Sequence, residues 1–245
     1  MTDTGPRTRE RASSTPTRAW LILAVLLLFS IAAPLNQFKV PPIMPVLIES
    51  LGLSFGNSGL LMSLYAVTGL ILALPSGLIL QRAGFRVTGL LAGGSIALGA
   101  AIGALSQRTS VLLASRVVEG IGTSFMAVLA PAIIAQWFVA EHRGTAMGIW
   151  AAWVPVGTAA MLILAPGVAQ ASGWRSVWWV GAIYALVATL LYLVVVRPRR
   201  AALPDGSETR PTPRVSPSRV LRNVDVWLLA AAFGAFNAAV IGFGT

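Results

Sequence analysis

Apolar residues run along this chain in long stretches that short polar segments separate. Six stretches approach or exceed the roughly 20 residues that a helix needs to cross a bilayer, and a seventh begins near the C-terminal end. The stretches are Trp20 to Ile48, Ser58 to Leu80, Val87 to Leu105, Val111 to Trp137, Gly144 to Ala169, Ser176 to Val196 and Val226 to Thr245. The pattern predicts an all-α membrane protein, a bundle of six transmembrane helices followed by the start of a seventh helix.

Composition supports this class. Hydrophobic residues make up 56% of the chain and charged residues 11%, with a mean hydropathy of +0.77, whereas a soluble domain carries about 25% charged residues. The net charge of +10 does not indicate nucleic acid as a partner, because the basic residues lie between apolar stretches and do not alternate with aromatic residues. With no cysteine and one histidine, His142, we expect no cofactor and no metal site.

The placement of arginines predicts the orientation. If the N-terminus is cytoplasmic, fourteen arginines lie in inner segments and only Arg108 and Arg175 lie in outer loops, which is the expected positive-inside bias. We therefore predict an integral protein of the cytoplasmic membrane. Residues 1–18 form a cytoplasmic tail, 19–196 the six-helix half, 197–225 a cytoplasmic linker rich in Arg, Pro and Ser, and 226–245 a truncated seventh helix.

Three ionisable residues fall inside the apolar stretches: Lys39, which is the only lysine, Arg116 and Glu119. A charge at the centre of a membrane helix costs roughly 2.5 to 3.5 kcal/mol even on an insertion scale, so such residues are usually functional. Arg116 and Glu119 are three apart and share a helix face. They either form an ion pair that offsets the cost of burial, or Arg116 lines a cationic cavity while Glu119 binds the proton that couples transport.

Lys39 has two interpretations. Asn36 lies three residues earlier on the same helix face, and the pair would suit an anion, with Pro34, Pro41 and Pro42 bending the helix and opening backbone groups. Alternatively, Lys39 lies near the far edge of the bilayer and extends to the interface as an anchor.

The loop after the second stretch carries the most specific motif. Gly77-Leu-Ile-Leu-Gln81-Arg82-Ala-Gly84-Phe-Arg86 resembles the signature loop of the major facilitator superfamily, with Gln81 in place of the usual acid. The glycines would permit a tight turn and close helix approach, and the arginines would hold neighbouring helix ends. The resemblance implies a gating loop formed by Gly77, Gln81, Arg82, Gly84 and Arg86.

Two further segments extend this resemblance. Arg116-Val-Val-Glu119-Gly-Ile-Gly122 is similar to the fourth-helix motif of the family, and the segment Asn36 to Pro45 is similar to the first helix of its cyanate, nitroimidazole and nitrate permeases. The family would then supply a central cavity lined by helices one, two, four and five. Asn36, Lys39, Tyr65, Arg116 and Trp153 are the candidate substrate-binding residues, with Glu119 as the proton-coupling residue.

The resemblance implies secondary active transport of a small polar or anionic solute by alternating access. The transport would be coupled to protons if Glu119 is the proton-coupling residue. The expected partners are that solute, the lipid bilayer and a missing C-terminal six-helix half. The alternative is a non-transporting membrane scaffold or regulatory partner derived from such a transporter. Glycines at four-residue spacing in the third stretch, at 89 and 93 and again at 99 and 103, predict close helix contacts without a substrate role.

Overall fold

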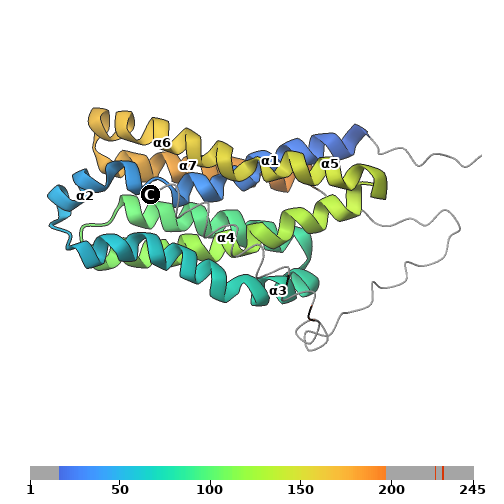
Figure 1. Cartoon of the computed structure of the whole chain (residues 1–245), viewed down its shortest axis with the longest axis horizontal. Coiled ribbons are helices and arrows are strands. Elements are labelled where there is room, and N and C mark those ends of the chain that lie inside the picture. The colour runs from blue at the N-terminus through green and yellow to red at the C-terminus, as the bar shows by residue number, and fades with distance from the viewer. Residues whose placement is uncertain (1–16, 197–223, 225–227, 229–245) are drawn as a thin grey trace, which may run out of the picture. The chain divides into compact units, whose positions relative to one another are not determined.

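The computed structural model describes residues 17–196, Val224 and Leu228. The helices in chain order are α1 (Thr17–Gln37), the short 3₁₀ helix η1 (Pro41–Ile43), α2 (Met44–Leu51), α3 (Phe55–Ala104), α4 (Thr109–Trp137), α5 (Ala140–Ala151), α6 (Trp153–Ser172) and α7 (Trp174–Val195). They belong to one compact unit, Met1–Arg199, and lie side by side along a common axis (Figure 1). No strand occurs in residues 17–196, which confirms the prediction of an all-α bundle. The predicted linker and seventh helix lie outside the described residues, apart from Val224 and Leu228.

The second and third predicted spans are the two halves of α3. Its backbone leaves the helical conformation only at Gly84, where φ is 74° and ψ is 175°. Before Gly84, positions along α3 advance with those of α4, since Leu61 contacts Arg116 and Ser76 contacts Ser124. After Gly84 the direction is reversed: Ile96 lies against Gly122, and Gly103 lies against Ser115. The chain therefore folds back at one residue, and the turn expected between Leu80 and Val87 is shorter than the sequence predicts (Figure 1).

Gly84 lies in a backbone region that only glycine adopts easily, so Gly84→Ala is expected to destabilise the bundle by about 1–3 kcal/mol. A methyl group there would meet no atom within 4 Å, so the effect would come from the backbone alone. Gly77→Ala is the matched control, because Gly77 is helical and also has open space around it. The control should be neutral or stabilising by about 0.5–1 kcal/mol. Thermal unfolding of both variants in detergent tests this, and equal midpoints would contradict it.

The outer surface of the bundle is apolar. Leu70 and Ile163 are each 77% exposed, and Val194 is 68% exposed. Within residues 17–196, five stretches are long and apolar enough to cross a membrane, and one of them, Gly56–Ala104, contains both halves of α3. The six predicted spans are thus all present, with η1 and α2 continuing the first span and α5 and α6 together forming the fifth.

Glycines in the second half of α3 let α4 and α7 approach closely. A methyl group on Gly93 would collide with Thr189 of α7, and one on Gly103 would collide with the Trp178 ring. Gly89 and Gly99 are equally crowded, by Tyr192 and Glu119. The predicted packing role of these glycines is confirmed.

The first span is broken in its middle by proline. The N–H of Phe38 still donates to the carbonyl of Pro34 at 2.9 Å, but α1 ends at Gln37 and the chain turns into η1 at Pro41. Pro41 and Pro42 have no N–H, so they cannot donate to the carbonyls of Gln37 and Phe38 one turn earlier. The last carbonyls of α1 therefore lack helical partners inside the bundle.

Candidate functional site

Arg116 of α4 supplies partners for the open end of α1. Its Nη1 donates to the carbonyl of Asn36 at 2.9 Å and its Nη2 to the carbonyl of Gln37 at 3.1 Å. Its Nε donates to the carbonyl of Leu61 in α3 at 2.9 Å. A cation at a helix C-terminus also interacts favourably with the helix dipole. One fully buried guanidinium thus connects α1, α3 and α4.

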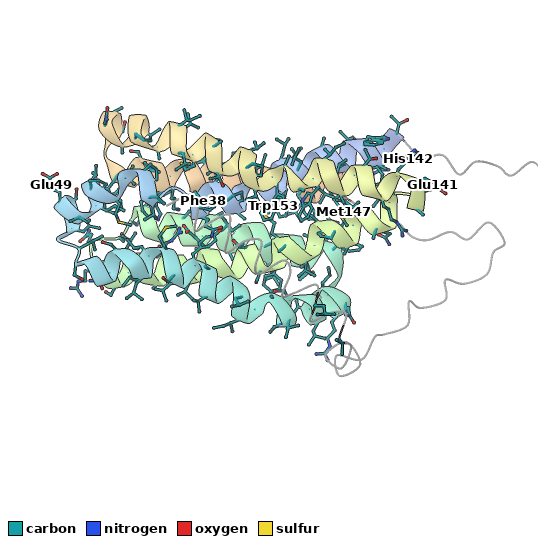
Figure 2. The ribbon with its side chains drawn as sticks, in the orientation of Figure 1. Phe38, Glu49, Glu141, His142, Met147 and Trp153 are labelled. Atoms are coloured by element: carbon teal, nitrogen blue, oxygen red, sulfur yellow. The ribbon has the colours of Figure 1, made fainter. Side chains whose placement is uncertain are left out.

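Lys39 lies inside the bundle. Its side chain is 0% exposed, and its Nζ donates to Oε1 of Glu119 at 2.6 Å and to Oδ1 of Asn36 at 2.9 Å. Phe38, the preceding residue, lies between the end of the bundle marked by Glu49 and the end marked by Glu141 and His142 (Figure 2). The ammonium therefore does not extend to an interface as an anchor would.

Glu119 lies between the two cations. Oε1 accepts from Lys39, and Oε2 accepts from Nη1 of Arg116, the i,i+3 pair that the spacing predicts. All three side chains are 0% exposed. Two cations and one carboxylate leave the cluster with one uncompensated positive charge when all are ionised. Such a buried group is stable only because its charges are paired and its remaining donors find acceptors.

Asn36 and Tyr65 complete the arrangement. Nδ2 of Asn36 donates to the carbonyls of Ala32 at 2.9 Å and Gly181 at 3.3 Å, which fixes Oδ1 toward Lys39. The Tyr65 hydroxyl donates to the carbonyl of Ala33 at 2.8 Å. The Tyr65 ring lies 4.5 Å from the guanidinium carbon of Arg116, in cation–π contact. The structure thus brings together five of the predicted site residues, Asn36, Lys39, Tyr65, Arg116 and Glu119, which we call the charged cluster.

Trp153, the remaining predicted binding residue, lies elsewhere in the packing. It is partly buried, stacks on Trp150 at 5.5 Å between ring centroids, and packs against both apolar core clusters. Sequence reasoning placed it in the site from its helix number alone.

The residues of the predicted gating loop lie at and around the turn of α3. Gly84 makes the turn, and Gly77 meets no atom of the described residues where a Cβ would lie, so its role in close helix approach stays a prediction. Gln81, Arg82 and Arg86 are exposed, and within residues 17–196 the two ion pairs both involve Glu119. The hydroxyl of Tyr192, on α7, instead donates to the carbonyl of Phe85 at 2.8 Å beside the turn.

Sequence reasoning missed Trp178 of α7, whose ring lies 4.7 Å from Nζ of Lys39. It also missed Thr123, whose hydroxyl forms a hydrogen bond with the hydroxyl of Tyr65. Nothing in the local sequence distinguishes Trp178 from Trp174 or Trp179 on the same helix. Its proximity to Lys39 depends on the close approach of α7 that Gly103 permits.

Comparison with known proteins gives the family. The model of the Major Facilitator Superfamily matches residues 20–245. The chain belongs to the major facilitator superfamily. The family match therefore agrees with the resemblance seen in the gating-loop and fourth-helix motifs.

Several transporters of the superfamily are similar to the chain. It is 27% identical over 219 residues to the cyanate transport protein CynX of Escherichia coli, covering 88% of this chain and 54% of CynX. It is 28% identical to human protein spinster homolog 1 over 80% of this chain and 38% of that protein. It is also 28% identical to the multidrug efflux pump LfrA of Mycolicibacterium smegmatis, over 81% of this chain and 38% of LfrA. The chain thus spans 38% to 54% of the length of these superfamily relatives.

Proposed function

We propose that this chain forms the N-terminal six-helix half of a secondary transporter that moves a small anionic or polar solute by alternating access. The half would act with a second six-helix half, and the solute would bind between them near the middle of the membrane. The N-terminus and the segment after α7 would lie in the cytoplasm, because the arginines gather on that side.

The charged cluster carries this proposal. Lys39 and Arg116 are fully buried in an apolar bundle and share one carboxylate, so the cluster has an excess of one positive charge. The excess positive charge would favour an anion over a cation as the solute at this site. The name of CynX, a cyanate transport protein, is consistent with a solute of that size and charge.

Coupling to protons follows from the same charge count. A proton on Glu119 would release Lys39 and Arg116, and an incoming monoanion could take the place of the carboxylate. The cluster would then hold two positive charges and one negative charge, as it does now. Because the net buried charge would not change, proton and anion could enter together at little extra desolvation cost.

Uptake of a panel of small anions, including cyanate, nitrate and formate, tests the solute class. The protein should carry this half together with its second half and be reconstituted in liposomes. Lys39→Ala is expected to weaken the apparent affinity about 30-fold or more, because losing one partner of a buried charge pair costs about 2 kcal/mol or more. Lys39→Arg keeps the charge but changes its geometry, and should retain part of the affinity.

Two outcomes would count against the proposal. Normal affinity in both Lys39 variants would remove Lys39 from the solute site. Stable membrane insertion without uptake of any anion would favour the alternative, a non-transporting scaffold. That alternative is supported by Gln81 standing where the family usually has an acid and by the exposure of Arg82 and Arg86 beside it.

A further inference from the structure

Trp178 contacts the Lys39 ammonium from α7. Its ring centroid lies 4.7 Å from Nζ, and both side chains are 0% exposed. An ammonium has three protons to donate. Two are used in the hydrogen bonds to Glu119 and Asn36, and the ring face is the third partner of the ammonium.

Packing alone does not explain a tryptophan at this position. The Trp178 Nε1 is buried and has no hydrogen-bond partner among the described residues, and an unpaired buried donor carries a free-energy cost that Phe or Leu would avoid. Tryptophan offers the strongest cation–π face of the aromatic side chains. The ring face toward Lys39 is the feature that an apolar replacement would lose.

The position of the ring is fixed from two sides. Gly103 of α3 lies so close that a methyl group there would collide with the indole, and Trp174 makes an edge contact at 5.4 Å between centroids. One turn further along α7, the carbonyl of Gly181 accepts from Asn36. A Cβ on Gly181 would collide with the Asn36 amide. Helix α7 thus contacts Lys39 through Trp178 and Asn36 through Gly181.

We propose that Trp178 is a positioning residue that holds the Lys39 ammonium in place when Glu119 releases it. This inference rests on the proposed function, in which Glu119 exchanges the cations for a solute anion. Held by Trp178 and Asn36, the ammonium would stay at the solute site during the exchange and not follow the carboxylate. Through Trp178, the solute site would include the sixth span, which is α7, in addition to the first, second and fourth spans.

The unique lysine makes a direct test available. In a chain labelled with ¹³C,¹⁵N-lysine and held in nanodiscs, every lysine signal comes from Lys39. The Hε protons near the face of an indole should be shifted upfield. The shift should be lost in Trp178→Leu and retained at smaller size in Trp178→Phe, which keeps a ring and serves as the variant less disturbing to folding. Trp150→Leu is the matched control, because Trp150 bonds to Ser30 and stacks on Trp153.

Glu119→Gln separates the ring contact from the ion pair, because glutamine keeps an acceptor oxygen but not the negative charge. If Trp178 positions Lys39, the upfield shift persists in Glu119→Gln, where the attraction of the carboxylate is gone. Loss of the shift in Glu119→Gln, or an unchanged signal in Trp178→Leu, would overturn the inference. The measurement needs no solute, so its failure is distinguishable from a failure of the proposed transport function, which the uptake experiment reports.

Discussion

Replacing Arg116 by leucine is expected to destabilise the six-helix half by about 3–5 kcal/mol, the range for breaking a buried ion pair on one side. Leucine would leave the carbonyls of Asn36, Gln37 and Leu61 without their buried donor. It would also leave Glu119 with Lys39 as its remaining cation. The expected result is a much lower thermal unfolding midpoint in detergent, because the broken α1 depends on this guanidinium.

Two further variants make that result specific. Arg116→Lys keeps the charge but lacks the planar guanidinium that donates to three carbonyls. It should therefore recover only part of the lost stability. Arg143→Leu is the control for loss of an arginine, since Arg143 is exposed and donates one hydrogen bond, from Nε to the carbonyl of Phe138 at 2.9 Å. The control should change stability by about 1 kcal/mol or less. An Arg116→Leu midpoint equal to that of Arg143→Leu would contradict the structural role of Arg116.

The second large effect is expected for Glu119→Gln in the full transporter. Glutamine keeps an oxygen that accepts from one cation but removes the negative charge and the titratable proton. The substitution therefore mimics the protonated cluster permanently. If protons enter and leave at Glu119, solute exchange should continue, while accumulation driven by a proton gradient should be lost.

Much of the charged cluster could be predicted from the sequence because burying a charge is costly. Lys39, Arg116 and Glu119 stand out within apolar stretches. The i,i+3 rule predicts the Arg116–Glu119 pair and the contact between Asn36 and Lys39, both of which the structure confirms. The six spans followed from length and hydropathy in the same way.

The rest depends on how distant segments pack. The sequence places prolines after Gln37, but it does not show that a guanidinium 79 residues away meets the carbonyl exposed there. Likewise, no local pattern indicates that Trp178 faces Lys39 while Trp153 packs against the edge of the apolar core. Hydrophobic periodicity is weak in helices that are apolar on every side, so it cannot tell which face meets which neighbour.

The sequence also did not predict how short the turn within α3 is. The motif from Gly77 to Arg86 predicts a loop, and polar residues within it support that prediction. In the structure, helix continues on both sides of Gly84, since one residue with positive φ is sufficient to reverse the chain. The motif locates the turn but does not determine how many residues leave the helix.

The most direct test of the account is solute movement by Glu119→Gln proteoliposomes under two conditions. With solute on both sides and no proton gradient, counterflow exchange should be close to that of the unsubstituted transporter. With an imposed proton gradient, the unsubstituted transporter should accumulate the anion and Glu119→Gln should not. Equal gradient-driven accumulation by both proteins would contradict the claim that Glu119, between Lys39 and Arg116, couples the proton to the anion.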